Sequence, residues 1–464
     1  MASGTQKAKA DVVSLSDPLK ELLAEFARMV YPLKRENVSL VPGQKTPLLM
    51  FGYINFAKWN DELGRLIAGD DALAKLFPPN GSTKDRFVYR SVGGTGPVSA
   101  PNVAGTICEA AWLAWQQRCN PPPTMDEFVA EVCETLDRLR RAAVGETVTM
   151  PVKVGLAGVK LPATRSEIVL PWCRIRPADE RDADAMAYLK DAGELQTTDA
   201  SGNTVSVSYG GDLVAEFDLP YTIRTADLHI FGAGQAGRDP WPTRLDAPAD
   251  ERRATIKPVD CIRAGFTLAG IVINGSLAAT WRCEVDPLEG FGCNIGWSDS
   301  HRSRIFPHQL SEDEVDRWTE WMERSWKFYD HIPIAITRLL RAVSEIKPRP
   351  EDTLIDAIIV WENVFGTPQE STMRITFSMA RILAQTPEER RDRWSDFKSI
   401  YTLRSDIVHG NDKSEKISPA KLYDAANRAV PISVELLRTV MASHPNLLTN
   451  HKNGAERSSA VLLS

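Results

Sequence analysis

The chain has 464 residues, a formal net charge of −6 at pH 7 and an ordinary hydrophobic share of 43%. This length allows about two or three domains. No apolar run reaches the ~18–20 residues that a membrane span needs. The acidic balance argues against a protein that coats nucleic acid non-specifically, so any RNA contact must be local.

The cysteines and the amino terminus predict a cytoplasmic protein. The seven cysteines are scattered from Cys108 to Cys293 without a C-x-x-C pair, which argues against a disulfide framework or a zinc ribbon. We expect most of them to be buried as small apolar residues. Met1 to Asp11 lacks an apolar core, which predicts neither a signal peptide nor an anchor.

Residues 1–145 are predicted to form a mainly helical region. Ser16-Asp17-Pro18 is a typical helix start and is followed by apolar residues at helical spacing. A capped helix is expected from Thr124 to Arg141. The segment from Pro78 to Pro101, rich in Gly, Pro and Ser, is expected to be a loop.

Residues 146–310 are predicted to form a β-rich domain with a sensing or regulatory role. Alternating apolar and polar residues, typical of strands, indicate a sandwich or a barrel-like sheet. The expected strands include 147–154, 204–209, 213–217, 228–231, 266–273 and 278–285.

Nothing in this middle region predicts a cofactor or a metal. Gly232 to Gly237 reads G-x-G-x-x-G, but a dinucleotide fold needs a helix to begin there. Arg238-Asp239-Pro240-Trp241-Pro242 follows instead and cannot form that helix, so we interpret the motif as a loop. His301 and His308 have no partner at a recognised metal-ligand spacing.

Residues 311–445 are predicted to form an all-α module, which makes the chain a multidomain α+β protein. Ser311 and Glu314 have the spacing of a capping box. Residues 446–464 are expected to be a flexible tail. The further helices are expected over about 335–346, 351–365, 371–385, 387–409 and 419–441.

Arg404 and His409 form the motif that predicts chemistry. On a helix beginning near Thr386, Arg404 falls near the centre of the apolar stripe, where an unpaired charge would be very costly. Gly410 is expected to end the helix, which places His409 at the negative end of the helix dipole. A fixed cation and a titratable imidazole about 7–8 Å apart along the axis suit phosphodiester cleavage.

Glu362 is the predicted partner of Arg404. It lies within the apolar stripe of the helix over 351–365, and two charges on buried faces are expected to meet each other or share a polar pocket. Glu362 would then orient Arg404 or lie in the cleft, although a purely structural ion pair fits the pattern equally well.

The residues around this motif resemble a HEPN domain of the Apea-like branch. The resemblance covers about the last third of the chain and implies a helical bundle, often dimeric, with an R-x(4–6)-H motif. Many members of that superfamily are metal-independent RNases of toxin and antiviral systems. The matching segments are Asp352–Glu362, Met373–Ile375, Pro387–Arg390 and Leu403–Gly410, within Arg341–Gly410.

The resemblance implies an endoribonuclease in which a 2′-hydroxyl of the RNA attacks the adjacent phosphorus. His409 would act as general base or acid, and Arg404 would hold the phosphate. Asp406 would either hydrogen-bond to His409 or face solvent. Ser405 departs from the family pattern, because active members often carry Asn, Asp or His directly after the Arg.

The expected partners are RNA, with tRNA as one candidate, and a second copy of the chain. Two protomers of such RNases usually meet at one composite cleft, which implies a homodimer. Further phosphate contacts are predicted for two pairs of residues, although a solvated face explains each pair as well: Arg374 with Arg381, and Arg390 with Arg391.

The resemblance also implies a role in prokaryotic defence against phage, with RNA cleavage triggered by a phage or cellular signal that acts through the first 300 or so residues. Two alternatives stay open. One is a non-catalytic HEPN adaptor that binds nucleotide, RNA or protein, which Ser405 and the acidic charge favour slightly. The other is a toxin neutralised by a partner that modifies or covers the motif.

Overall fold

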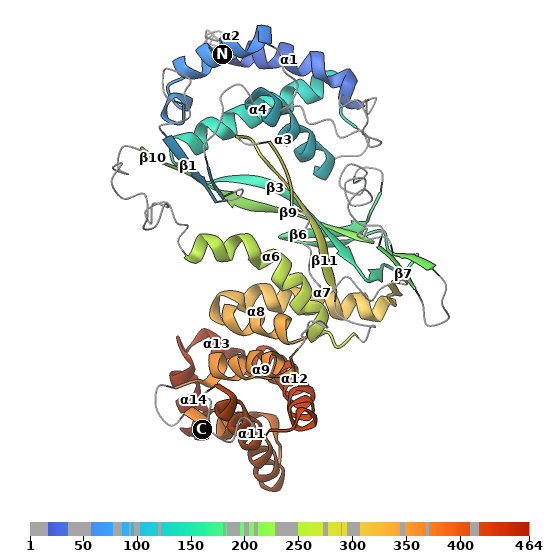
Figure 1. The fold of residues 1–464 in the computed structure, drawn as a ribbon, viewed down its shortest axis with the longest axis vertical. Coiled ribbons are helices and arrows are strands. Elements are labelled where there is room, and N and C mark those ends of the chain that lie inside the picture. The colour runs from blue at the N-terminus through green and yellow to red at the C-terminus, as the bar shows by residue number, and fades with distance from the viewer. Residues whose placement is uncertain are drawn as a thin grey trace, which may run out of the picture. The chain divides into compact units, whose positions relative to one another are not determined.

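The chain is a mixed α and β protein with a helical carboxyl-terminal region (Figure 1). The first of its two units comprises Met1–Val148, Tyr221–Asp246 and Val285–Gly292, and the second comprises Thr149–Pro220, Ala247–Glu284 and Cys293–Ser464. The computed structural model describes residues 17–35, 57–77, 86–91, 94–96, 103–118, 122–179, 182, 195–198, 204–207, 212–227, 249–271, 277–288, 290–294, 307–343, 349–367, 371–408 and 417–463.

Helices make up most of the first unit. Thr124 caps α4 as its sequence predicts, because its side chain accepts a hydrogen bond from the backbone of Glu127 and the Glu127 carboxylate accepts one in return. The core contains the rings of Tyr31, Trp112 and Phe128, whose centroids lie 5.5–6.4 Å apart. The helices are α1 (Pro18–Arg35), α2 (Ala57–Gly69), α3 (Val103–Arg118) and α4 (Met125–Ala143), with a short 3₁₀ helix, η2 (Leu73–Lys75).

A three-stranded antiparallel sheet in this unit corrects the prediction of a loop from Pro78 to Pro101. It has the order β10-β1-β2, with β1 (Arg86–Arg90), β2 (Gly94–Gly96) and β10 (Ile223–Asp227). The pairing of β1 with β10 joins segments more than a hundred residues apart in the chain, so no local pattern could indicate it.

The largest sheet has six strands in the order β12-β11-β3-β9-β6-β5, and most of its residues belong to the second unit. Gly155 on β3 lies opposite Trp281 on β11, and a Cβ at this glycine would overlap the buried indole. The six strands are β3 (Val148–Ala157), β5 (Ile168–Leu170), β6 (Cys173–Pro177), β9 (Leu213–Tyr221), β11 (Ala278–Asp286) and β12 (Gly290–Asn294).

Two small sheets complete the described strands of this unit, and one expected strand is absent. β13 (His308–Gln309) pairs in parallel with β4 (Val159–Lys160). β7 (Leu195–Thr198) pairs with β8 (Thr204–Val207). The prediction of a strand over 266–273 is wrong, because residues 266–268 are the end of helix α6 (Ala249–Leu268).

Helix α6 packs on α7 (Glu312–Phe328). The Trp318 indole donates to the carbonyl of Ile262 at 3.0 Å and meets the Phe266 ring edge-on. Ser311 and Glu314 form the predicted capping box at the start of α7. The 232–237 glycine motif and His301 lie outside the described residues.

The helical carboxyl-terminal region packs around α9. Trp361 on α9 is fully buried, and its indole donates to the Ser433 hydroxyl on α12 at 2.9 Å. Beyond the 3₁₀ turn η8 (Tyr329–His331), the helices are α8 (Pro333–Ala342), α9 (Pro350–Phe365), α10 (Ser371–Leu383), α11 (Pro387–Val408), α12 (Pro419–Ala442), α13 (Pro445–Thr449) and α14 (Gly454–Leu463).

The prediction of a flexible tail over 446–464 is wrong for its described part. α14 packs on α9 and α10, and Leu448, Arg457 and Val461 are buried. The Arg457 guanidinium donates to the carbonyls of Asn363 and His331 at 3.2 and 3.0 Å. These contacts stabilise a segment whose own composition is too polar to indicate a buried helix.

Candidate functional site

Arg404 lies on the buried face of α11, as its position in the sequence predicts. Phe397, Ile400, Tyr401 and Leu403 on this helix are all buried. The Arg404 side chain is 17% exposed, so its guanidinium is largely withdrawn from water near the end of the helix. Such a charge needs a partner or a ligand.

Glu362 is that partner, which confirms the predicted pairing. Arg404 Nη2 lies 3.1 Å from Glu362 Oε2, and this pair joins α11 to α9. Tyr401 Oη donates to the other carboxylate oxygen, Oε1, at 2.7 Å. The two donors lie three residues apart on α11 and therefore on the same face of the helix, where they hold Glu362 between them.

Tyr401 was overlooked as a site residue, because an aromatic side chain within an apolar stripe predicts a core position. Its ring is indeed buried, and only the hydroxyl reaches the carboxylate. The signal that could have revealed it is its spacing from Arg404, since buried tyrosine hydroxyls usually find a polar partner.

The Arg404 guanidinium keeps a donor for a ligand. Its Nε is buried and has no hydrogen-bond partner among the residues that the structure describes. A buried donor without a partner costs free energy, typically about 1–3 kcal/mol. Because this nitrogen is also closed to solvent, an oxygen-rich anion such as a phosphate would satisfy it only after the surrounding side chains move, with Nη2 kept on Glu362.

A pocket of about 510 Å³ opens beside this cluster. Glu362 and Tyr401 form one side of it, and Asn453 and Ala455 from the start of α14 form another. Its volume lies within the range of about 300–1,000 Å³ that is usual for small-molecule sites. The remaining lining residues are Gly366, Thr367 and Ile375.

The other residues of the predicted motif are only partly placed. His409 lies outside the described residues, so its distance from Arg404 stays a prediction. Ser405 and Asp406 are half-buried on the last turn of α11. The proposed bond between Asp406 and His409 is therefore untested.

The four predicted RNA-binding arginines do not gather around Arg404. Arg374 donates to the Ser459 hydroxyl on α14 at 2.7 Å, and Arg390 Nε points to the carbonyl of Ala384 at 3.4 Å. Arg391 is exposed, but thirteen residues of helix place it about 20 Å from Arg404 along the axis. Arg381, on the last turn of α10, is half-buried.

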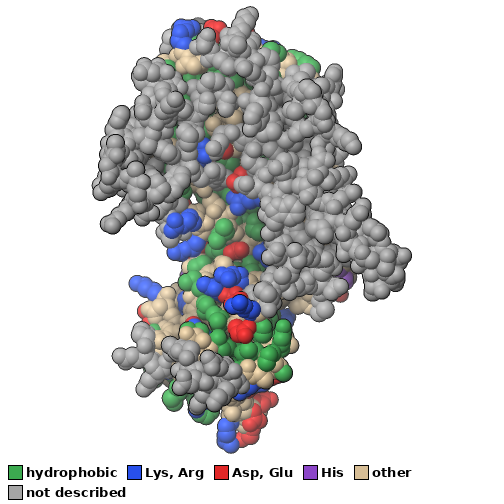
Figure 2. All heavy atoms as spheres, viewed as in Figure 1, with side chains coloured by type: hydrophobic (Ala, Val, Ile, Leu, Met, Phe, Trp, Pro, Cys, Tyr) green, Lys and Arg blue, Asp and Glu red, His purple; other side chains and the backbone are tan. Residues whose placement is uncertain are grey.

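The charges of the described surface are mixed. Figure 2 shows Lys and Arg side chains lying beside Asp and Glu side chains on the described part of this face. A continuous basic track is the usual electrostatic footprint of a protein that binds long nucleic acid. No such track is visible on the described part of this face.

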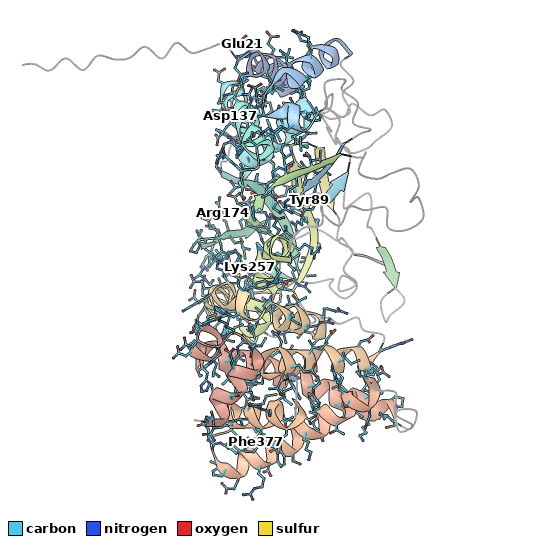
Figure 3. The ribbon with its side chains drawn as sticks, turned by 90° about the vertical axis from the view of Figure 1, so that its left-hand side faces the viewer. Glu21, Tyr89, Asp137, Arg174, Lys257 and Phe377 are labelled. Atoms are coloured by element: carbon cyan, nitrogen blue, oxygen red, sulfur yellow. The ribbon has the colours of Figure 1, made fainter. Side chains whose placement is uncertain are left out.

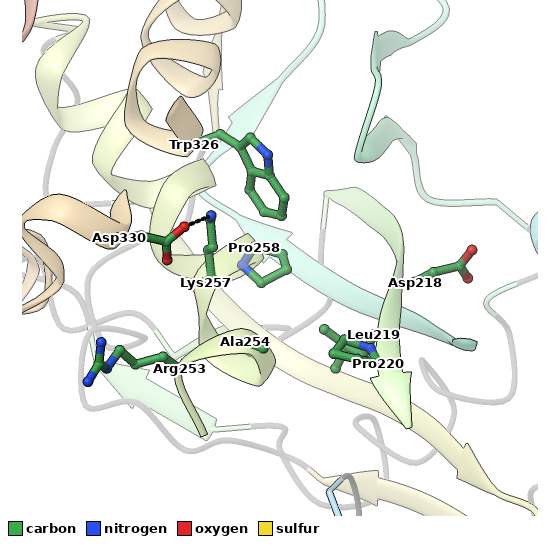
Figure 4. A pocket seen from close by; sticks show the side chains of 9 residues that line it. All are labelled: Asp218, Leu219, Pro220, Arg253, Ala254, Lys257, Pro258, Trp326 and Asp330. Atoms are coloured by element: carbon green, nitrogen blue, oxygen red, sulfur yellow. Dashed lines mark hydrogen bonds and ion pairs between the residues drawn. The ribbon is translucent and has the colours of Figure 1, made fainter. Parts of the chain in front are cut away.

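A second pocket, of about 490 Å³, lies between α6, α7 and the end of β9 (Figure 4). Lys257 Nζ lies 2.6 Å from Asp330 Oδ2 and 4.4 Å from the centroid of the Trp326 ring. Trp326 also stacks on Trp172, with ring centroids 4.3 Å apart. Because the ammonium and the indole are both already engaged, we regard this pocket as the weaker candidate.

A buried charge network in the large sheet is balanced within itself. Arg176 lies 2.8 Å from Asp182 and 2.7 Å from Glu216, and Lys153 lies 3.3 Å from Asp182. All four side chains are almost inaccessible to water. Their mutual pairing accounts for the burial of the four charges, although Glu216 Oε2 is itself buried without a hydrogen-bond partner among the described residues.

The described residues contain no group of three or more His, Cys, Asp and Glu side chains suited to a metal ion. Among these residues, too, no helix has both the length and the apolar character required to span a membrane.

No protein-family model matches the chain, and no significant match was found among curated proteins or among solved structures. The geometry around Arg404, Glu362 and Tyr401 is therefore the basis on which a function is assigned.

Proposed function

We propose that the chain is a metal-independent endoribonuclease of the HEPN type, with Arg404 and His409 as its catalytic residues. The observation that carries the proposal is the largely buried Arg404, held at Nη2 by Glu362 while Nε has no partner among the described residues. His409 follows it by five positions, the spacing of the R-x(4–6)-H motif.

The chemistry needs a cation and a proton acceptor but no metal. Arg404 binds the scissile phosphate and stabilises the charge that develops on its oxygens. His409 removes the proton from the 2′-hydroxyl, whose oxygen attacks phosphorus and expels the 5′-oxygen of the next nucleotide, which takes a proton from water. The products are a 2′,3′-cyclic phosphate and a 5′-hydroxyl.

Glu362 and Tyr401 position Arg404 in this scheme. The carboxylate fixes one end of the guanidinium, and the tyrosine hydroxyl fixes the carboxylate. A cation held in one orientation stabilises a developing charge without reorganising at the moment of reaction.

The carboxyl-terminal helices, α8 to α14, are proposed to be the HEPN bundle and to form a homodimer. Support for the dimer comes from α10, where Met373 is 61% exposed and Phe377 is 43% exposed (Phe377 is labelled in Figure 3). Together with Trp394 on α11, whose ring lies 6.2 Å from that of Phe377, they give this surface an apolar character suited to a partner.

The remainder of the chain is proposed to sense a phage or cellular signal that releases the RNase. RNA, with tRNA as one candidate, is the proposed substrate, and the cytoplasm is the proposed location. A cell must keep such an activity silent until it is needed, so we expect the first 300 or so residues to control it.

The test is RNA cleavage in EDTA by the full chain and three variants. Wild type should cut total RNA or tRNA, whereas Arg404→Ala and His409→Ala should lose activity by at least about a hundredfold. Arg393→Ala is the matched control, because Arg393 also lies on α11 and pairs with Glu435 at 2.8 Å.

Activity that EDTA abolishes would contradict the proposal, because it would indicate a metal enzyme. Equal loss in Arg393→Ala and Arg404→Ala, with both variants folded, would contradict the assignment of the site to Arg404. If the folded wild type binds RNA in EDTA without cutting it, even in a lysate of phage-infected cells, the adaptor is supported instead.

A further inference from the structure

We infer that the pocket beside Glu362 is a subsite for a guanine base of the RNA substrate. This inference rests on the proposed function and goes beyond it, because it names the nucleotide that the site selects. Three features support it: the charge of the pocket, the acceptor positions of Glu362 that no described residue occupies, and the close contact of the start of α14 with the end of α9.

The charge of the pocket argues against a second phosphate. Of the described residues that line it, Glu362 alone carries a charge, and that charge is negative. A phosphate would be repelled there, because Arg404, the partner of this carboxylate, is not among the residues that line the pocket. The pocket therefore suits a neutral group that donates hydrogen bonds.

Glu362 retains acceptor capacity for such a group. A carboxylate offers about four lone-pair positions, and Tyr401 and Arg404 use one on each oxygen. The Glu362 side chain is 27% exposed, so the remaining positions are accessible from the pocket.

Guanine matches a carboxylate better than the other bases. Its Watson–Crick edge presents N1–H and N2–H side by side, as the fork of an arginine does, and can bind both carboxylate oxygens. Adenine and cytosine present one exocyclic amine each, and uracil presents a single N–H. The Thr367 and Asn453 side chains add polar groups elsewhere on the pocket wall.

The start of α14 contributes to the pocket lining and lies in close backbone contact with the end of α9. A Cβ at Gly454 would lie 2.6 Å from the backbone nitrogen of Gly366, so only glycine allows the two backbones to approach. The amino-terminal end of α14 is also stabilised by a side chain, because Asn453 Oδ1 accepts a hydrogen bond from the backbone N–H of Glu456 at 3.0 Å. Ala455, which lines the pocket, therefore belongs to a backbone segment that is fixed against the end of α9.

The experiment is equilibrium binding of the four nucleosides to the full chain, compared with RNA cleavage. Guanosine should bind wild type at least about fivefold more tightly than adenosine, cytidine or uridine. Ala455→Leu, which places a larger side chain in the pocket, should remove this preference. Ala420→Leu is the matched control, because Ala420 lies exposed on the first turn of α12.

A second variant keeps the inference testable if Ala455→Leu fails to fold. Ala455→Val enlarges the same lining side chain by less than leucine does, and it should weaken guanosine binding by at least about threefold. Equal affinities for all four nucleosides, or a guanosine preference unchanged in a folded Ala455→Leu protein, would overturn the inference.

The failure of the inference and the failure of the proposed function give different results. Cleavage that depends on Arg404 but shows no preference for guanosine would leave the RNase proposal standing and reject the subsite. Selective guanosine binding lost in Ala455→Leu, without cleavage that depends on Arg404, would support the subsite and reject the RNase.

Discussion

At the scale of single residues, Glu362 is the centre of the site. Its two oxygens take hydrogen bonds from Tyr401 and Arg404, so it connects the predicted cation to the pocket. The sequence predicts this ion pair because both charges fall within apolar stripes. It does not predict the hydrogen bond from the Tyr401 hydroxyl, because hydrophobic periodicity does not indicate where the hydroxyl of a buried ring points.

The two ion pairs of α11 provide a matched test of burial. Glu362→Ala should lower the free energy of unfolding by about 1.5–3 kcal/mol, because it leaves the largely buried Arg404 without a partner. Glu435→Ala breaks the pair with Arg393, whose side chains are 37% and 43% exposed, and should cost about 0–1 kcal/mol. Urea denaturation of both variants measures the difference. Equal losses in the free energy of unfolding would show that burial does not strengthen the contribution of the Arg404 pair to stability.

Asp260 predicts a pH dependence of stability. Burial raises the pKa of its carboxyl above the ordinary 3.8, although hydrogen bonds from Tyr329 and Thr337 act in the opposite direction. The native state therefore binds this proton more tightly than the unfolded chain does. As pH rises from about 3.8 through the raised native pKa, this residue's contribution to stability must fall.

Asp260→Asn tests that sign directly. The variant should lack this contribution. As pH increases from about 4 to 7, the free energy of unfolding of wild type should therefore fall relative to that of Asp260→Asn. Urea denaturation across this range is the measurement. The same pH profile for both proteins would mean that Asp260 titrates normally in the native state.

At the scale of elements, α14 shows where local patterns fail. A ten-residue helix is marginal on its own, so its stability comes from packing on α9 and α10. The Arg457 guanidinium is buried, which lowers its pKa, and it donates to carbonyls of α9 and η8. The sequence alone presents Arg457 as a solvent-exposed charge, and this is why the segment was predicted to be flexible.

Two leucines of this segment distinguish a packed end from a flexible one. Leu448 is 0% exposed and Leu463 is 88% exposed. Leu448→Ala should lower the free energy of unfolding by about 2–5 kcal/mol, because it leaves a cavity in the core. Leu463→Ala should change it by less than about 0.5 kcal/mol. Thermal or urea unfolding measures both changes. If neither substitution altered the free energy of unfolding, the prediction of a flexible tail would be supported instead.

At the scale of the whole molecule, the sequence predicts the class but not the division into units. A mixed α and β chain with a helical carboxyl-terminal region follows from periodicity and caps, which are local signals. The first unit also takes in Tyr221–Asp246 and Val285–Gly292. The pairing of β1 with β10 and contacts such as the hydrogen bond from the Thr106 hydroxyl to the carbonyl of Pro287 hold those segments in the unit, and periodicity carries no information about such long-range contacts.

The chemical ends of the RNA fragments test the central claim most directly. Cleavage by Arg404 and His409 predicts 2′,3′-cyclic phosphate at the 3′ end and hydroxyl at the 5′ end of every cut, in EDTA as in buffer. Mass spectrometry of a cleaved oligonucleotide identifies both ends. Fragments with 3′-hydroxyl and 5′-phosphate ends would contradict the account, because attack by the 2′-hydroxyl cannot produce them.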